Sequence, residues 1–364
     1  MRKLASVQII EKLEEIPDAQ KIEKATILGW EVVVNKGKFK VGDTCVYVEV
    51  DSILPPKPEF FFLEPRRYRI RTIKLKKQVS QGIAFTFEDV GIKIFGLPIG
   101  TDLTETLGIK KHDPQLQAEQ AIVDQKKRGP VHKFLLRFKW YRELVKPRGS
   151  WPSWIRKTDE ERIQNIPSLL QTCSEVDVYW TEKLDGQSGS FSLKFSGPFN
   201  LFRIFTVCSR NMWLKKPTTM SYWQIAKKYD LERKLKAYNK ELLIQGEICG
   251  PGIQKNKYNL TEYDFFVFNV YDIKTKTWYG YEKILETCIN LGLRTVPMMG
   301  EGKLGALFKD VPAAVEASRG ASVLKPVYRE GIVVRSFDDV PDGTRGLSFK
   351  IINPDFLLGL SDDE

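Results

Sequence analysis

A lysine followed closely by an aspartate and a glycine, Lys183-Leu184-Asp185-Gly186, is the segment of this chain best suited to chemistry. It ends a β-prone run. A lysine amine is a nucleophile only when deprotonated, and its ordinary pKa is about 10.4. Burial beside a bound cation would lower that pKa and free the lone pair. With the nearby carboxylate holding a metal, Lys183 would suit attack on phosphorus, although such a tetrapeptide also fits a solvated surface turn.

Five later segments place charged or aromatic side chains in or at the ends of expected strands. Arg210 follows a β-prone run, where it could contact a ribose or phosphate or be solvated. Glu247 lies within an apolar run, and a buried carboxylate needs a ligand or an arginine partner. Phe268 could stack on a base or pack in a core. Glu330 suits Mg²⁺ or Mn²⁺, and Lys350 within an apolar strand requires an anionic partner such as a phosphate.

Composition narrows the class of protein. A chain of 364 residues with 42% hydrophobic residues predicts two or three domains with packed cores. Because it has no apolar run of about 18 residues and no apolar leader, we expect a soluble, cytoplasmic protein without a membrane partner. The two histidines, His112 and His132, argue against histidine-based hydrolysis, phosphorelay and histidine-ligated metals. Five scattered cysteines without a C-x-x-C pair suggest neither disulfides nor zinc.

The net charge of +11 is unevenly distributed. Residues 1–110 carry 18 Lys and Arg against 15 Asp and Glu, residues 111–157 carry 12 against 4, and residues 158–364 carry 27 against 27. Such a basic segment favours a polyanion partner, most simply nucleic acid, although it also fits a merely soluble basic surface.

The spacing of β-prone runs predicts three regions. Residues 1–110 hold runs at 5–11, 30–35, 44–50, 69–75 and 82–87, which favour a small β-barrel of the OB-fold type. Residues 111–150 form a basic linker with a polar helix at 113–127. Within 131–142 aromatics alternate with cations, as in a phosphate-gripping helix or an ordinary amphipathic connector. Its candidate nucleic-acid contacts are Lys133, Arg137, Lys139 and Arg142.

Residues 151–364 predict an α+β domain. Expected strands are 176–183, 189–195, 203–209, 242–248, 264–271, 331–336 and 346–351. Expected helices are 159–168, 218–239, 281–291 and 312–321.

The order of these motifs, rather than any one of them, identifies a family. K-x-D-G at 183–186, S-R-N at 209–211, G-E at 246–247, F-N at 268–269, E-G-I-V-V-R at 330–335 and F-K at 349–350 resemble the covalent nucleotidyltransferases. That superfamily contains RNA ligases, DNA ligases and mRNA capping enzymes. Residues 151–165 and 250–256 resemble RNA ligases in particular. The segments 29–30, 42–43, 49–55 and 80–82 are similar to the N-terminal OB domain of Deinococcus-type RNA ligases, with a related arrangement in the Naegleria type.

This resemblance implies an ATP-dependent RNA ligase with an ATP-grasp-like adenylation domain of antiparallel sheets and helices. Lys183 would form a lysyl-AMP intermediate, AMP would pass to an RNA 5′-phosphate, and a 3′-OH would then displace AMP. Its implied partners are RNA ends, at nicks in duplex, bound by a monomer. The implied contacts are Glu182 over adenine through its backbone, Arg210 and Glu247 on the ribose, Phe268 on the base, Glu330 and Asp185 on Mg²⁺ or Mn²⁺, and Lys350 on the α-phosphate.

Two departures from the family pattern bear on this interpretation. Many relatives carry K-x-K in the last motif, whereas Lys350 is followed by two isoleucines. Only 14 residues follow Lys350, which leaves no room for the C-terminal OB domain of DNA ligases and capping enzymes. The alternatives are a capping-type guanylyltransferase, which would use GTP, and a non-catalytic OB-fold RNA-binding protein.

Overall fold

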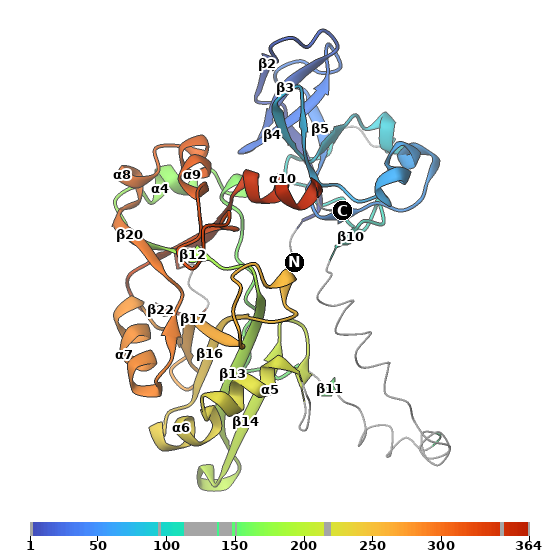
Figure 1. The fold of residues 1–364 in the computed structure, drawn as a ribbon. Coiled ribbons are helices and arrows are strands. Elements are labelled where there is room, and N and C mark those ends of the chain that lie inside the picture. Colours follow the sequence, from blue (N-terminus) through green and yellow to red (C-terminus); the bar gives the residue numbers. More distant parts are fainter. Residues whose placement is uncertain are drawn as a thin grey trace.

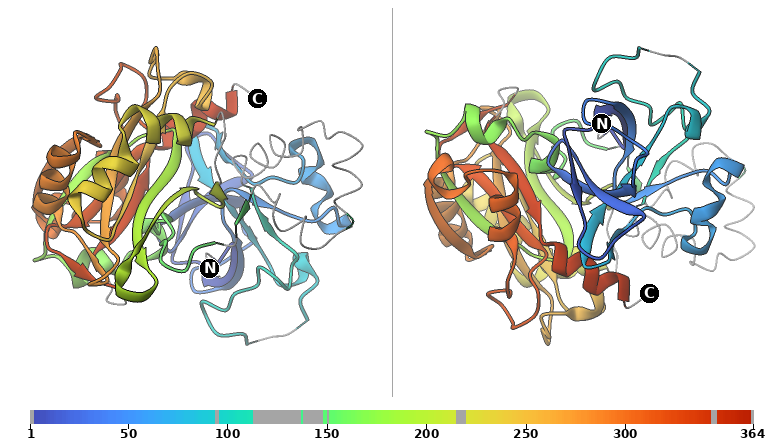
Figure 2. Two further views of the ribbon diagram at one scale, coloured as in Figure 1. Left: turned by 90° about the horizontal axis from the view of Figure 1, so that it is seen from below. Right: turned by 90° about the horizontal axis from the view of Figure 1, so that it is seen from above.

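The computed structural model shows two β-rich domains side by side, with a C-terminal helix at their junction (Figure 1). The structure describes residues 3–93, 96–112, 137, 148–149, 151–214, 220–342 and 346–362. Views from below and above show the same two bodies in contact (Figure 2).

The N-terminal domain is a small barrel of short antiparallel strands. Its sheets pair β1 (Ala5–Ile9), β5 (Thr44–Val48) and β9 (Ile83–Phe85), then β2 (Lys12–Glu15), β3 (Ile22–Ile27) and β4 (Trp30–Asn35), then β7 (Thr72–Leu75) with β8 (Gln78–Gln81), and β6 (Ser52–Ile53) with β10 (Lys110–Lys111). Burial alternates along β3 and β4, as expected for strands with one face on a core. Trp30 is fully buried in that core.

The C-terminal domain is built on two antiparallel sheets. The larger runs in the order β11 (Arg148–Gly149), β15 (Trp213–Leu214), β14 (Phe202–Ser209), β13 (Gln187–Ser196), β16 (Leu242–Cys249), β17 (Asp264–Asp272), β18 (Thr277–Trp278) and β22 (Val340–Pro341), with β19 (Arg294–Thr295) beside β17 in parallel. The smaller runs β20 (Met298–Lys303), β12 (Asp177–Lys183), β21 (Gly331–Ser336) and β23 (Ser348–Ile352). The predicted order of a small N-terminal β domain followed by an α+β domain is confirmed.

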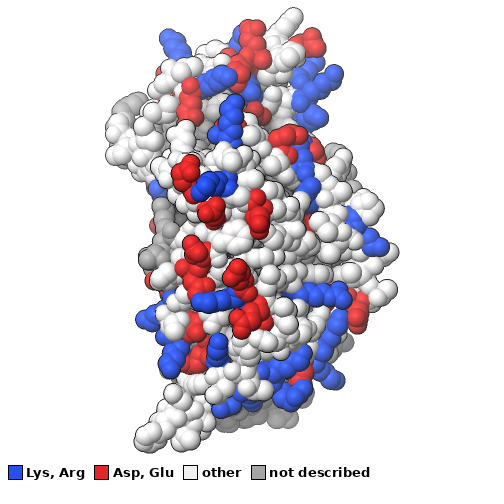
Figure 3. Space-filling view, turned by 90° about the vertical axis from the view of Figure 1, so that its left-hand side faces the viewer, with Lys and Arg blue, Asp and Glu red and all other residues white. Residues whose placement is uncertain are grey.

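Helices pack on both sheets. The larger sheet contacts α5 (Ser221–Lys228), α6 (Leu231–Tyr238) and α7 (Tyr281–Leu291), and the smaller contacts α8 (Leu304–Leu307) and α9 (Val311–Ser318), with α4 (Leu169–Thr172) against α8. Helix α10 (Pro354–Asp362) contacts β7 of the barrel. None of the helices among the described residues is long and apolar enough to span a membrane. On the face in Figure 3, cations and anions are interspersed over the middle of the molecule.

Several sequence predictions are wrong in detail. The helix expected at 159–168 is an extended segment with a single 3₁₀ turn, Ile163–Asn165. The helix expected at 218–239 is two helices, because Asp230 adopts a left-handed conformation (φ 52°) between α5 and α6. Strands β2, β3, β8 and β20 and helix α10 were not predicted. The helices expected at 113–127 and within 131–142 lie outside the described residues, apart from Arg137.

Candidate active site

Lys183 is the last residue of β12, where the chain passes from the small sheet into β13 of the large one. Val178 and Trp180 pack on the core beneath α8 and α9, so the alternation of a strand turns Thr181 and Lys183 to the opposite face. Lys183 pairs in register with Gly331 of β21. The residue before that glycine, Glu330, is therefore beside the lysine.

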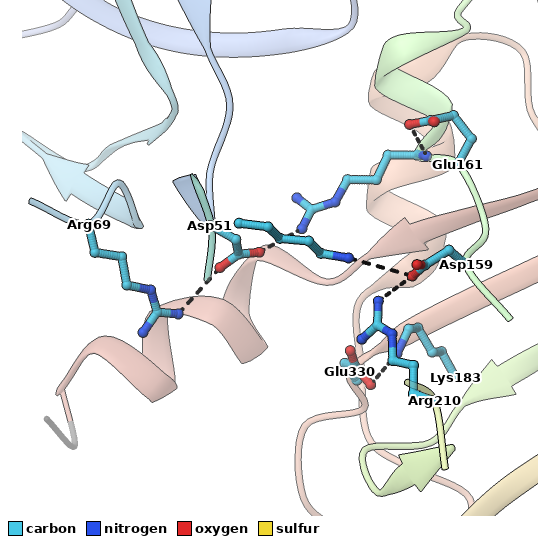
Figure 4. A network of polar contacts seen from close by, with 9 residues as sticks. Asp51, Arg69, Asp159, Glu161, Lys183, Arg210 and Glu330 are labelled. Carbon is cyan, nitrogen blue, oxygen red and sulfur yellow. Dashed lines mark hydrogen bonds and ion pairs between the residues drawn. The ribbon is translucent and has the colours of Figure 1, made fainter. Parts of the chain in front are cut away.

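Three carboxylates surround the lysine amine. Lys183 Nζ forms an ion pair with Glu330 Oε2 at 2.5 Å (Figure 4). Glu247 Oε1 accepts a hydrogen bond from the Gly186 backbone N–H at 3.1 Å. Asp185 Oδ2 pairs with Lys257 Nζ at 2.7 Å. Three potential negative charges thus face two lysine cations.

The charge balance sets the protonation states. Burial lowers the pKa of Lys183, but the carboxylates of Glu330 and Glu247 outweigh it and leave that pKa raised. Burial, with Glu330 adding to it, raises the pKa of Glu247 to about 8 and that of Asp185 to about 6. The excess negative charge is therefore removed by a proton on the cluster, and Lys183 is protonated in the free protein.

A cavity of about 470 Å³ opens over Lys183 between the two domains. Its walls include seven residues of the N-terminal domain and its end, among them Arg69, Arg71 and Lys111. All eight residues predicted for catalysis, nucleotide and metal line it: Glu182, Lys183, Asp185, Arg210, Glu247, Phe268, Glu330 and Lys350. The fold therefore brings these eight residues, which are spread over about half of the chain, together around one cavity.

The four outer cavity residues, those outside the cluster of Lys183 and the three carboxylates, reach the cavity from different strands. They are Glu182, Arg210, Phe268 and Lys350. The Glu182 side chain is buried and Oε2 accepts the Val323 N–H at 2.8 Å. Phe268 lies at a β-bulge of β17, because Gln245 pairs with Asn269 and Gly246 with Val267. Bulges commonly re-aim a side chain next to active sites. Lys350 alternates with the buried residues Phe349 and Ile351 of β23.

Arg210 follows β14 and contacts Asp159. Lys157 Nζ also donates to the Arg210 carbonyl at 3.2 Å. Sequence reasoning gave no role to Asp159, which lies in the segment expected to be helical.

Several other residues in or beside the cavity were given no role from the sequence. The guanidinium carbon of Arg335 lies 5.8 Å from the centre of the Phe268 ring. Arg335 also forms an ion pair with Glu160 at 3.0 Å. The Tyr258 hydroxyl accepts the Asp185 N–H at 2.8 Å. The one signal in the sequence for Tyr258 and Lys257 is the Gly- and Asn-rich loop 250–258 after Glu247, because its residues 250–256 resemble RNA ligases.

The predicted nucleic-acid contacts are not brought to the site by the described structure. Lys133, Lys139 and Arg142 lie outside the described residues. Arg137 is exposed and does not line the cavity.

The donor set fits a hard divalent cation. Such ions prefer carboxylate oxygens, and Mg²⁺ is commonly held by one or two carboxylates plus waters. Among the described side chains no cluster of three or more acidic, histidine or cysteine groups forms a ready-made cage. Glu330 and Asp185 instead form ion pairs with the ammonium groups of Lys183 and Lys257.

Comparison with known proteins agrees with this geometry. Residues 4–87 match an OB-fold domain family and residues 176–352 match the RNA ligase family. Solved structures of Naegleria gruberi RNA ligase are similar over the whole chain. The structure with pyrophosphate has 28% identity, a TM-score of 0.81 and 100% coverage of both chains. A mutant with AMP and Mn has 28% identity, a TM-score of 0.80 and 98% coverage of both. No curated protein matched the sequence.

The two domains and the lysine-centred cavity define the class of this protein. It is an RNA ligase, with an N-terminal OB-fold domain followed by a nucleotidyltransferase domain.

Proposed function

We propose that this enzyme is an ATP-dependent RNA ligase that joins 3′-OH and 5′-phosphate RNA ends at duplex nicks, in RNA repair. The observation that carries the proposal is the convergence of Lys183, three carboxylates and the outer cavity residues in one interdomain cavity. The Naegleria structures were solved with ATP and Mn and with AMP and Mn, which supports the same ligands here.

In the first step Lys183 Nζ attacks the α-phosphorus of ATP. A P–N bond forms, the bond from the α-phosphorus to the bridging oxygen breaks, and pyrophosphate leaves. Because the free protein holds Lys183 as an ammonium, its proton must leave before attack. A divalent cation on Glu330 and Asp185 would neutralise phosphate charge and weaken the electrostatic hold of the carboxylates on that proton.

In this proposal the four outer cavity residues, together with Glu247, bind and orient the nucleotide. Phe268 stacks on the adenine, against which the backbone of Glu182 also lies. Arg210 and Glu247 hold the ribose, and Lys350 contacts the α-phosphate. Transfer of this kind depends mainly on positioning and charge neutralisation, so these contacts account for most of the protein's contribution.

The second and third steps require RNA. AMP passes from Lys183 to the RNA 5′-phosphate, and the 3′-OH then attacks that phosphate and releases AMP. The cationic wall of the N-terminal domain, with Arg69, Arg71 and Lys111, faces the same cavity. Together with the basic segment 111–157 and its residues Lys133, Arg137, Lys139 and Arg142, it is suited to the RNA phosphates. We propose that the enzyme acts as a monomer in the cytoplasm.

A nick-sealing assay tests this function. The substrate is an RNA duplex with one nick carrying 3′-OH and 5′-³²P termini, with ATP and Mg²⁺ or Mn²⁺. We expect sealed strand and, with a 3′-deoxy terminus, accumulation of the adenylylated strand. A 5′-OH nick is the matched control and should remain open. Tight RNA binding without sealing or adenylylated strand would instead indicate a non-catalytic RNA-binding protein.

A further inference from the structure

A short segment, residues 157–165, here called the strap, runs between the two domains and binds a different element at almost every position. Toward the nucleotidyltransferase domain it reaches β13, β21, β23 and the end of β14. Its contacts there are Lys157 Nζ to the Arg210 carbonyl (3.2 Å), Ser188 Oγ to Thr158 Oγ1 (3.1 Å), Arg335 and Ser348 to Glu160 (3.0 and 2.7 Å), and Lys350 N to the Glu161 carbonyl (2.8 Å). These partners prevent the helix expected from the sequence.

The strap also binds the OB-fold domain. Arg162 pairs with Asp51 at 3.1 Å, and Trp30 Nε1 donates to Asn165 Oδ1 at 2.7 Å. The Gly29 N–H donates to the Gln164 carbonyl at 2.9 Å, and a Cβ on Gly29 would lie 2.8 Å from Gln164 Cα. The OB-fold domain therefore fits closely against the strap.

The Asp159 side chain joins the two domains at the cavity. Its carboxylate contacts Arg210 of the nucleotidyltransferase domain and lies 3.7 Å from Lys111 Nζ, at the end of the OB-fold domain (Figure 4). Burial raises the pKa of this carboxyl, but Arg210, Lys111 and Lys350 outweigh it and leave that pKa lowered. Asp159 is thus an anion at neutral pH, shared between two cations on two domains.

We propose, on the basis of the proposed function, that Asp159 is a positioning residue that couples the docked OB-fold domain to Arg210. It fixes the guanidinium at the ribose end of the cavity, and Lys111 fixes Asp159. The position of the nucleotide-binding arginine would then depend on the place of the RNA-binding domain. Asp159 itself touches no reacting atom.

The test is a kinetic cycle on the full-length enzyme, with formation of the protein–AMP adduct as the readout. Asp159→Asn should raise the KM for ATP about 5-fold to 10-fold and leave kcat within about 2-fold of the wild-type value. This effect is intermediate between the loss of an exposed ion pair and the loss of a buried one. Lys111→Met should raise KM about 2-fold to 3-fold, but should add nothing in the Asp159→Asn background. Asp159→Glu should restore much of the loss. Asp177→Asn and Lys303→Met, an exposed pair on the neighbouring strands β12 and β20, are matched controls.

The outcomes separate this inference from the proposed function. A wild-type enzyme that forms no adduct contradicts the proposed function itself. A wild type that forms the adduct, with the KM of Asp159→Asn unchanged or the two substitutions fully additive, contradicts only the coupling. Loss of kcat together with a lowered melting temperature, without a KM effect, would indicate a merely structural role and also contradict it.

Discussion

At the scale of the residue, the cluster around Lys183 carries an excess of negative charge when no nucleotide or metal is bound. Glu330, Glu247 and Asp185 face Lys183 and Lys257, and a proton balances the difference. In the proposed reaction, this arrangement would hold Lys183 as an ammonium until a divalent cation binds the carboxylates. Metal binding and loss of protons should therefore be coupled.

The first prediction concerns pH and metal together. Because a cation bound by Glu330 and Asp185 would favour loss of the proton on neighbouring Glu247, whose pKa is about 8, the rate of adduct formation at limiting Mn²⁺ should rise as pH increases from 6 to 8.5. Saturating Mn²⁺ should move the midpoint of the rise to lower pH. Rates of protein–AMP formation across pH at two metal concentrations measure this. A midpoint independent of metal would contradict the coupling.

The second prediction is that Glu247→Gln inactivates the enzyme but stabilises it. A carboxyl whose folded pKa is raised binds more protons in the folded than in the unfolded state between about pH 4.5 and 8. The free energy of unfolding therefore falls through this range as pH rises. We expect the variant to melt at least about 2 °C above wild type at pH 8.5, with little difference at pH 4.5. Metal-free thermal unfolding at both pH values tests it, and a lowered melting temperature at pH 8.5 would contradict it.

At the scale of the element, the pairing of Lys183 in β12 with Gly331 in β21 holds Glu330 beside Lys183. Gly331 permits this because a Cβ there would lie 2.1 Å from the Ile351 carbonyl oxygen, and its φ is 156°. A side chain at this position must push β21 away from β23. The position of Glu330 beside Lys183 depends on that close approach.

The third prediction follows from this packing. Gly331→Ala should cost about 1–3 kcal/mol of stability and slow adduct formation at least about 10-fold, because Glu330 shifts. The matched control is Gly359→Ala in α10, where a Cβ meets nothing within 4 Å. That change should leave activity intact and leave stability equal or slightly higher. Equal effects of the two substitutions would contradict the role of the β21 register.

Some elements around the site were predictable from the sequence and others were not. The strands around Lys183, Glu247 and Lys350 were predictable because they are runs of apolar and β-branched residues and because the motifs follow one another in order. The strap was not, because its acidic and amide residues have helical spacing but bind partners on distant strands. Asp159 and Lys257 owe their places to tertiary contacts, which local patterns do not encode. The break at Asp230 likewise overrides a continuous helical pattern.

At the scale of the whole molecule, the two domains have separate cores but share one cavity. The first core draws on residues 4–109, and the remaining cores draw on residues 155–351. The predicted nucleotide contacts all lie after residue 157, while the positive charge lies before it. We therefore expect the C-terminal domain to form the AMP adduct, and the N-terminal domain with segment 111–150 to be needed mainly for the RNA steps.

The fourth prediction is a separation of steps. A protein that starts at Trp151 should still form the AMP adduct, with KM for ATP raised as in Lys111→Met. It should seal nicks at least about 100-fold more slowly, because the cationic wall and segment 111–150 are gone. Single-turnover sealing by pre-adenylylated protein isolates the RNA steps. A folded truncated protein that cannot adenylylate would contradict this division.

The proposed function depends above all on Lys183 as the acceptor of AMP. The most direct measurement is incubation with α-³²P-ATP and Mn²⁺, followed by denaturing electrophoresis and mass mapping of the labelled peptide, with GTP in parallel. We predict a covalent label from ATP on Lys183, lost in Lys183→Ala and retained in Lys303→Ala. No label, label on another residue, or label from GTP in preference to ATP would contradict it.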